Sequence, residues 1–314
     1  MPAETLVIAN PASAGGSTGR RWGRIEPLLR DALGELEVET TRAPRDAVRI
    51  AREAARAGVE RILVAGGDGT TSEVVTGLVE AHLSAEVRLG LLPMGSGGDF
   101  RRGLGLPSDL PSAIDLLGSG ATRRVDAGRL EYRDARGATR SAVFLNVASF
   151  GISGLVDEMV NRAPKTLGGT AAFALGALRA LARYRSEDVR VRVDGEVVHE
   201  GPLLLAAVAN GRYFGGGMHV APGAHPDDGR FEVVVVEGMS RWRSLAAFPS
   251  LYRGTHVSDP AVTVYRGARV EAESPTGTVW LDVDGEALGT LPAAIEVLPG
   301  AVTLVGLPPG AEAS

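Results

Sequence analysis

Short strand-like segments alternate with amphipathic helical segments up to about residue 125. Four segments have the length and residue types of strands, at residues 5–9, 37–41, 62–65 and 87–92. Between them, apolar side chains recur at helical spacing, at 19–33, at 46–56 and beyond residue 73. Alternation of this kind with short loops predicts a doubly wound, parallel α/β sheet.

The pattern changes near residues 122–125, after the glycine-rich segment GSGATRR. Beyond it, strand-like pieces are separated by turn dipeptides such as Asp194-Gly195 and Asp284-Gly285. This arrangement predicts a largely antiparallel β domain. The pieces are residues 129–132, 142–147, 189–193, 203–209, 231–236, 261–265, 268–273 and 278–283, with two more between 294 and 307.

One helical insertion, at about residues 153–184, interrupts the β domain. Its second half, AAFALGALRALARY at 171–184, is apolar, but the run is too short to span a bilayer and Arg179 interrupts it. Packing against the β domain is therefore the favoured interpretation, and contact with a lipid surface is the alternative.

The segment GGDGT at 66–70 lies between a strand and a helix. Glycines permit tight turns and close approach of a ligand to the backbone, and the N–H groups at a helix N-terminus attract phosphate. We expect Thr70 or Thr71 to cap this helix, with Glu73 in its first turn. Asp68 would repel phosphate directly, so we expect it to act through Mg²⁺.

Two further glycine-rich loops follow strands in the same way, at 10–16 and at 95–99. Ligands of doubly wound sheets sit beyond the carboxyl ends of the strands, where all three loops are expected to lie. Three loops converging on one edge predict a nucleotide site more strongly than any single loop does.

Composition narrows the function further. A net charge of -5 gives no general affinity for nucleic acid, and the absence of cysteine excludes zinc–thiolate sites and cysteine nucleophiles. The five histidines lack the spacing of a metal site. We find neither a signal peptide nor an apolar run long enough to span a membrane, so we expect a cytoplasmic protein. Peripheral contact with the inner membrane face and a homodimer both remain open.

The motifs, taken in order, resemble the diacylglycerol kinase catalytic family, and most closely the bacterial diacylglycerol and lipid kinases. The resemblance covers nearly the whole chain. It is carried by NPASAGG at 10–16, GGDGT at 66–70, LGLLPMGSGGDF at 89–100, FLNVASFGISG at 144–154, ANGRYFGGGMHVAPGAHPDDG at 209–229 and DGE at 284–286.

The family implies an α/β nucleotide domain followed by a β-sandwich domain, with the end of the chain returning to the first domain. We therefore expect domains at 1–123 and 124–290, and a return at 291–314. The implied reaction is Mg²⁺-assisted transfer of the γ-phosphoryl group of ATP to a hydroxyl of a lipid, such as diacylglycerol, that a membrane surface presents.

The resemblance also implies the residues that contact the nucleotide. Thr41 matches a family threonine before the second helix, with Thr40 as the alternative if the alignment slips by one. The full set is Asn10, Pro11, Ala12, Ser13, Ala14, Thr41, Gly66, Gly67, Asp68, Gly69, Thr70, Thr71, Ser72, Ser96 and Asp99. Asp68 and Asp99 are expected to steer the catalytic Mg²⁺ by charge.

The family takes its catalytic base from the glutamate of an Asp-Gly-Glu motif, and this chain has two copies. The copy that ends at Glu196 lies between VRVRV and VVHEG, so it is expected to be a simple hairpin turn. The copy that ends at Glu286 matches the family position. We expect Glu286 to be the base, with Asp284 in the surrounding network and Glu286 facing the three loops across a gap between two domains.

A second, structural Mg²⁺ site is also implied by the resemblance. Asp228 would supply the carboxylate, and His225 and Arg230 would supply backbone carbonyls. Without the family, Asp228-Gly229 would be interpreted as a tight turn only.

The chain departs from the family pattern at Gly98, where an asparagine usually precedes the aspartate. The lost amide would remove a hydrogen bond of roughly 1 kcal/mol. Two alternatives to a lipid kinase are kept, of which only the second draws on Gly98. One is a relative of NAD kinases, which share GGDGT. The other is a catalytically silent nucleotide-binding regulatory protein.

Overall fold

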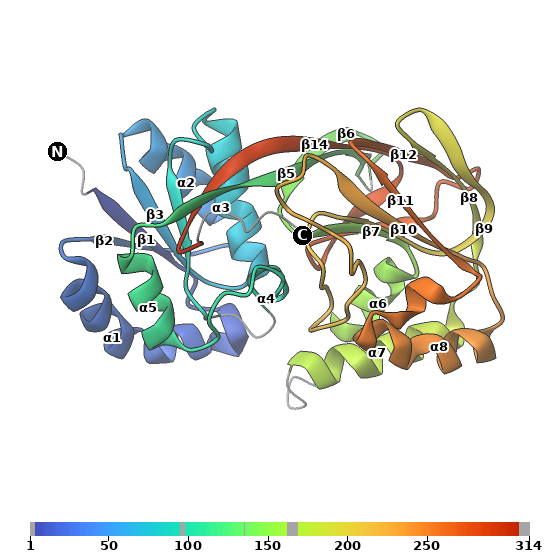
Figure 1. Cartoon of the computed structure of the whole chain (residues 1–314), viewed down its shortest axis with the longest axis horizontal. Coiled ribbons are helices and arrows are strands. Elements are labelled where there is room, and N and C mark those ends of the chain that lie inside the picture. The colour runs from blue at the N-terminus through green and yellow to red at the C-terminus, as the bar shows by residue number, and fades with distance from the viewer. Residues whose placement is uncertain (1–3, 95–97, 135, 162–168, 308–314) are drawn as a thin grey trace. The chain divides into compact units, whose positions relative to one another are not determined.

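The structure, a computed structural model, describes residues 4–94, 98–134, 136–161 and 169–307. The chain divides into two units (Figure 1), and each is described by itself. The first unit comprises Met1–Asp126 and Pro299–Ser314, and the second comprises Ala127–Leu298. Two long strands, β5 (Thr122–Arg133) and β14 (Glu286–Val305), carry the chain from one unit into the other.

In the first unit, five strands are parallel neighbours in the order β2-β1-β3-β4-β14. The strands are β1 (Thr5–Ala9), β2 (Glu37–Thr40), β3 (Arg61–Ala65), β4 (Arg88–Leu91) and the last residues of β14. Every residue of β1 is buried, as expected for a strand covered on both faces.

Helices cover both faces of this sheet. Helices α1 (Ser13–Leu33) and α5 (Leu110–Gly118) pack on one face, where Ile25, Leu29 and Leu117 meet alternate residues of β1 and β3. Helices α2 (Asp46–Arg56) and α3 (Asp68–Glu80) pack against each other, and α4 is the short helix Asp99–Gly103. The predicted doubly wound parallel fold is confirmed.

The second unit is built on a closed circuit of six antiparallel strands, in the order β9-β7-β13-β14-β12-β8 and back to β9. Strands β10 and β11 extend from β9, and β5 and β6 extend from β14. The bounds are β6 Thr139–Phe144, β7 Val147–Gly151, β8 Glu187–Val193, β9 Glu196–Ala209, β10 Phe231–Glu237, β11 Val262–Gly267, β12 Arg269–Glu273 and β13 Trp280–Val283. The predicted antiparallel β domain is confirmed.

Strands β7, β9 and β10 are buried on both faces. One face contributes residues such as Phe150, Ala206 and Val233 to the core of the strand circuit. The other face packs against α6 (Ile152–Asn161), α7 (Gly169–Arg183) and α8 (Arg241–Arg253), which Figure 1 shows grouped on one side of this unit. The short 3-10 helix Thr255–Ser258 follows α8. Two-sided burial explains why β10 is a continuous valine run without alternation.

Several local expectations were wrong. The helix after GGDGT begins at Asp68, and neither Thr70 nor Thr71 caps it, because Gly67 is the N-cap and has no side-chain cap. The end of the chain forms one long strand, β14, where two short ones were expected. Helix α8 was not expected at all. Pro249 lies inside this helix, and proline usually breaks a helix. Ser240 is its N-cap, and the Ser240 Oγ accepts from the Arg243 N–H.

Candidate functional site

Side-chain hydrogen bonds join the three glycine-rich loops of the first unit. Asn10 follows β1, and its Nδ2 donates to Thr70 Oγ1 of the second loop at 2.9 Å. Thr18, just after the first loop, is buried, and its hydroxyl donates to the carbonyl of Met94 beside the third loop at 3.2 Å. The first loop is therefore bonded to both of the others, at the carboxyl ends of the parallel strands.

A further bond links the second loop to the third. The Asp99 N–H donates to Asp68 Oδ2 at 3.0 Å, so the first turn of α3 is tied to the first turn of α4. The Asp99 carboxylate is buried and accepts from Arg102 Nη1 at 2.6 Å. Arg102 therefore balances the charge of Asp99, and Asp68 is the half-buried carboxylate of the two.

Arg101 adds a cation to this edge of the sheet. Burial lowers the pKa of its guanidinium, and the opposite charge of Asp68 acts against that shift. One Nη donates to the carbonyl of Pro107. Sequence reasoning missed Arg101 and Arg102, although two consecutive arginines directly after the third loop were a signal that could have found them.

The geometry of the second loop requires a glycine at its first position. A Cβ on Gly66 would lie 2.5 Å from the Cβ of Thr70, which is closer than side chains approach in proteins. Since no side chain caps α3, its first N–H groups are not used by a cap. The loop therefore presents backbone donors at the positive end of a helix, which is the arrangement that binds phosphate.

Glu73 is not in the first turn of α3, where it was expected, and it contacts another helix. It lies beyond the first turn of α3, and its carboxylate accepts from the backbone N–H groups of Arg45 at 2.9 Å and Ala47 at 3.3 Å. It therefore satisfies donors at the start of α2 and fixes the contact between α2 and α3.

The first loop turns through consecutive left-handed residues, Ala14, Gly15 and Gly16, with φ of 51°, 63° and 80°. Here the Ala12 N–H donates to Asn10 Oδ1, and the Ser13 hydroxyl donates to the Asn10 carbonyl. Together these bonds hold Asn10 against Thr70.

The remaining predicted contacts lie on the same edge of the sheet. Thr41 is buried directly after β2, and its N–H donates to the Ala9 carbonyl. The first turns of α3 and its N-cap hold Gly67, Gly69, Thr71 and Ser72, and the first loop holds Pro11, Ala12, Ser13 and Ala14. Ser96 lies outside the described residues.

Gly98 precedes Asp99 with φ of +65°, the left-handed conformation. Asparagine is the residue that tolerates this conformation best after glycine. A Cβ there would meet only the far end of the Arg101 side chain, at 2.8 Å. Glycine therefore retains the backbone shape that an asparagine would have at this position.

The Asp-Gly turn at Asp284 is held firmly in the second unit. Asp284 Oδ1 accepts from the N–H groups of Asn146 at 3.2 Å and Val147 at 2.9 Å, and Oδ2 accepts from Leu145 at 3.1 Å. The Gly285 N–H donates to Asp282 Oδ1 at 2.9 Å. This network fixes the turn that leads directly to Glu286, the exposed first residue of β14.

The second Asp-Gly turn is a simple hairpin between β8 and β9, as expected. Asp194 Oδ1 accepts from the N–H groups of Ala268 at 3.0 Å and Arg269 at 2.8 Å. Glu196, the counterpart of Glu286, is exposed on this hairpin.

Two small apolar cavities, of about 50 and 70 Å³, lie between the sheet of the second unit and helices α7 and α8. Both are lined by Ile152, Leu181 and Phe248. The smaller also reaches Asp282 and Ser153, and among the described residues no partner bonds to the buried Ser153 hydroxyl. Apolar space thus adjoins the strand that carries the Asp284 turn.

The segment with His225, Asp228 and Arg230 was predicted to hold a metal ion. Asp228 Oδ1 accepts from the Arg230 N–H at 3.0 Å, and Oδ2 lies 3.7 Å from Arg266 Nη2. The ring nitrogen Nδ1 of His225 lies 3.5 Å from Arg212. The same Nη2 of Arg266 donates to the Gly223 carbonyl at 2.5 Å, so its contact with Asp228 is the looser of the two.

Two family models match the chain. The diacylglycerol kinase catalytic domain matches residues 4–130, and the YegS C-terminal NAD kinase beta sandwich-like domain matches residues 146–306. The chain is 30% identical to a diacylglycerol kinase of Mycobacterium tuberculosis over 304 residues, which are 96% of this chain and 94% of that protein. It is 33% identical over 288 residues to a probable lipid kinase YegS-like of Chromohalobacter salexigens, with 88% of each covered.

Solved structures agree with these matches. A putative diacylglycerol kinase from Bacillus anthracis is 27% identical, with a TM-score of 0.74 and 96% of each chain covered. Yeast NADH kinase is similar in fold alone, at 11% identity and a TM-score of 0.54 over 97% of this chain and 84% of that one.

These comparisons first define a class, the two-domain proteins with a kinase-type catalytic domain followed by an NAD kinase-like β sandwich. Within that class, the chain belongs to the diacylglycerol kinase and YegS-like lipid kinase family.

Proposed function

We propose that this protein is an ATP-dependent lipid kinase that transfers the γ-phosphoryl group to a hydroxyl of a lipid such as diacylglycerol. The observation that carries the proposal is the joining of the three loops, through Asn10–Thr70, Thr18–Met94 and Asp68–Asp99. Loops bonded to one another in this way form a preorganised cradle, which is what phosphoryl transfer chiefly requires from a protein.

In the proposed reaction the lipid hydroxyl oxygen forms a bond to the γ-phosphorus of ATP. The bond from that phosphorus to the bridging oxygen breaks, and the products are ADP and a phosphorylated lipid. Glu286 accepts the hydroxyl proton, and Asp284 fixes the turn from which Glu286 projects. Backbone N–H groups of the second loop and the α3 N-terminus bind phosphate oxygens.

Asp68, a half-buried carboxylate in the first turn of α3, is the group that would hold an accompanying Mg²⁺ beside the second loop. Such an ion would offset the negative charge of the phosphates. At the predicted structural site, Asp228 would supply the carboxylate for a structural Mg²⁺, with the carbonyls of His225 and Arg230, and Arg266 lies 3.7 Å from that carboxylate.

A lipid acceptor is supported by the smaller of the two apolar cavities, which reaches Asp282, two residues before Asp284. An NAD-kinase-like activity rests on the shared GGDGT and on a likeness of fold alone. A silent regulatory role would rest on Gly98 alone. Gly98 has a left-handed backbone that an asparagine could also adopt, so the exchange leaves the shape of the loop unchanged. The lipid kinase is therefore the better-supported proposal.

The two Asp-Gly-Glu turns provide a matched test of the base. We expect Glu286→Gln to reduce lipid phosphorylation by a factor of about 10² to 10⁴, the usual contribution of a general base, with unchanged affinity for ATP. Glu196→Gln makes the same change on the other turn and should retain full activity. The measurement is transfer of labelled phosphate from ATP to a panel of lipids and to NAD, alongside ATP binding by calorimetry.

Three outcomes would contradict the proposal. Full activity of Glu286→Gln would show that Glu286 is not the base. Labelling of NAD but of no lipid would favour an NAD kinase. ATP binding without transfer to any lipid in the panel would favour the silent regulatory protein.

A further inference from the structure

Positive charge is segregated onto two stretches of the second unit. No acidic residue occurs between Glu158 and Glu187, or between Glu237 and Asp259. These stretches contain seven arginines and the single lysine, in a chain with 38 acidic residues and a net charge of -5. The described parts of the stretches include the helices α7 and α8.

The outer sides of these two helices form one surface. Helices α7 and α8 contact each other and pack on the same sheet face through Ala180, Leu181 and Phe248, so their opposite sides point away from that sheet together (Figure 1). The outward residues of α7 are Leu178, Arg179, Ala182 and Arg183, and those of α8 are Trp242, Ala246, Pro249 and Arg253. We refer to these eight residues as the α7–α8 face.

The α7–α8 face combines exposed apolar groups with uncompensated cations. Trp242 is 83% exposed and Leu178 is 38% exposed. Among the described residues, Arg179, Arg183 and Arg253 form no ion pair. Arg243 lies beside Trp242, but it is paired with Asp259 at 2.6 Å and so is not counted in the face.

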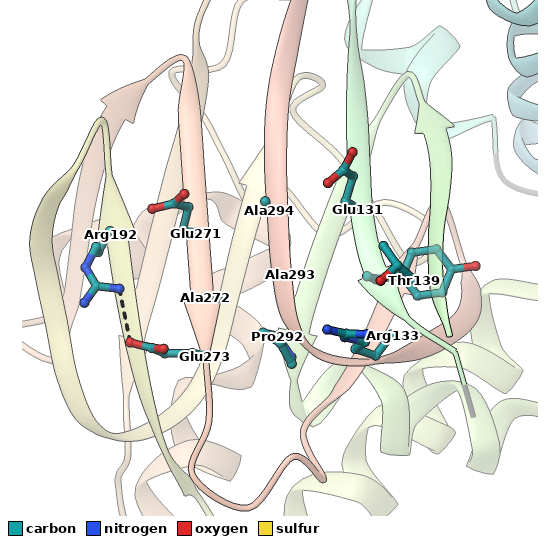
Figure 2. A pocket seen from close by; sticks show the side chains of 11 residues that line it. Glu131, Arg133, Thr139, Arg192, Glu271, Ala272, Glu273, Pro292, Ala293 and Ala294 are labelled. Atoms are coloured by element: carbon teal, nitrogen blue, oxygen red, sulfur yellow. Dashed lines mark hydrogen bonds and ion pairs between the residues drawn. The ribbon is translucent and has the colours of Figure 1, made fainter. Parts of the chain in front are cut away.

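A charged surface elsewhere on the same unit shows the contrast. Figure 2 shows a trough of about 460 Å³ on the outer side of β5, β14, β12 and β8. There acids and bases lie together, and Arg192 Nη1 bonds to Glu273 at 3.1 Å. This trough therefore mixes charges of both signs, in contrast to the α7–α8 face, which has cations only.

We propose that the α7–α8 face docks on an anionic phospholipid bilayer. Trp is the side chain that prefers the membrane–water boundary, and arginines near an anionic surface each strengthen binding severalfold. The helices would lie in the plane of the interface, since no described helix is long and apolar enough to cross it. This inference deepens the proposed function by naming the surface through which lipid is approached, but docking itself needs no turnover.

The test measures sedimentation of the full chain with vesicles, without nucleotide. Phosphatidylserine in phosphatidylcholine is the anionic probe, because its headgroup carries no hydroxyl acceptor, and pure phosphatidylcholine is the neutral probe. We expect binding to the anionic vesicles only, weakening as salt rises. The double variant Arg179→Gln/Arg183→Gln should lose binding by roughly 25-fold, at about fivefold for each arginine.

Two controls make the result specific. Arg56→Gln/Arg129→Gln removes the same charge from exposed positions elsewhere and should bind as the parent does. Trp242→Ser should weaken binding, whereas Trp242→Phe should largely retain it. Equal losses in the two arginine doubles, equal binding to neutral vesicles, or preference for an acidic polymer such as heparin over anionic vesicles would overturn the proposal.

Phosphorylation of a short-chain lipid dispersed in detergent keeps the two proposals separate. There the Arg179→Gln/Arg183→Gln variant should turn over at the parent rate. Failure of the parent to phosphorylate any lipid would contradict the kinase, whereas vesicle binding tests the face alone.

Discussion

Asp284 and Asp194 are the first residues of similar Asp-Gly turns, but they use their carboxylates differently. Asp284 engages both oxygens, with Oδ1 accepting from Asn146 and Val147 and Oδ2 accepting from Leu145. Asp194 accepts from the N–H groups of Ala268 and Arg269, and both of these bonds end on Oδ1. An amide can replace a carboxylate that uses one oxygen, but not one that uses two.

This difference gives a prediction at the scale of single residues. Asp284→Asn would point an NH₂ group at the Leu145 N–H, so we expect the free energy of unfolding to fall by about 1–3 kcal/mol. Asp194→Asn can retain both bonds through its one oxygen and should cost less than about 1 kcal/mol. Urea denaturation of the two variants measures the difference, and equal losses would show that the three-bond network does not fix the turn.

Single residues also show where sequence reasoning falls short. Thr70 was expected to cap α3, but its hydroxyl accepts from Asn10, sixty positions earlier. Glu73 was expected in the first turn of its own helix, but it lies beyond that turn and bonds to the start of α2. A side chain near a helix start can serve either its own helix or a neighbouring segment, and only the packing of the elements decides which.

At the scale of elements, α2 and α3 pack closely because α3 has a glycine at the contact. A Cβ on Gly77 would lie 2.3 Å from the carbonyl oxygen of Val48 and 3.0 Å from the Cβ of Ala51. Backbone atoms cannot move aside as the end of a long side chain can. The sequence offers no sign of this, because a glycine inside a helix usually only weakens it.

We therefore predict opposite effects for two glycine substitutions in helices. Gly77→Ala should destabilise the protein by about 1–3 kcal/mol, because the helices must separate, despite the better helix propensity of alanine. Gly23→Ala in α1 meets nothing within 4 Å and should stabilise by about 0.5–1 kcal/mol. Thermal unfolding by circular dichroism measures both signs. A stabilised Gly77→Ala would mean that α2 and α3 do not pack this closely.

The type of an element was predictable where the spacing of its apolar residues agrees with the residues that start and end it. The bounds of α2, Asp46–Arg56, are those that the amphipathic pattern predicts. Helix α8 was missed because Ser240 signals the start of a helix whereas Pro249, nine residues later, signals its end. The helix forms despite the proline because Phe248 packs on the sheet. Local signals that conflict are resolved by tertiary contacts.

At the scale of the whole molecule, the first unit needs the end of the chain. Strand β14 pairs with β4, and its last residues bury Val302, Leu304 and Val305 with 0–4% exposure. The Gly300 N–H donates to Asp126 Oδ1 at 2.7 Å, so the two crossing points of the chain are adjacent. The unit is therefore assembled from segments more than 170 residues apart in sequence.

This arrangement predicts how fragments behave. Residues 1–126 alone lose four buried apolar side chains, those of Val302, Leu304, Val305 and Leu307. Each is worth about 1.5–3 kcal/mol, so the loss is a large part of a typical stability of about 5–15 kcal/mol. We expect that fragment not to unfold cooperatively. The same fragment joined to 299–314 by a short glycine–serine linker at Asp126 should unfold in one transition by circular dichroism. Cooperative unfolding of both fragments at the same temperature would contradict the prediction.

The sequence by itself determined the class of each half of the chain, the three glycine-rich loops and the resemblance that names the family. These follow from the periodicity of apolar residues and from short motifs, which are local properties. Only the tertiary structure decided that Asn10 meets Thr70, that Asp68 meets the Asp99 backbone, and that Asp284 holds three distant N–H groups. Contacts between residues far apart in sequence depend on how whole elements pack, and no local pattern encodes that packing.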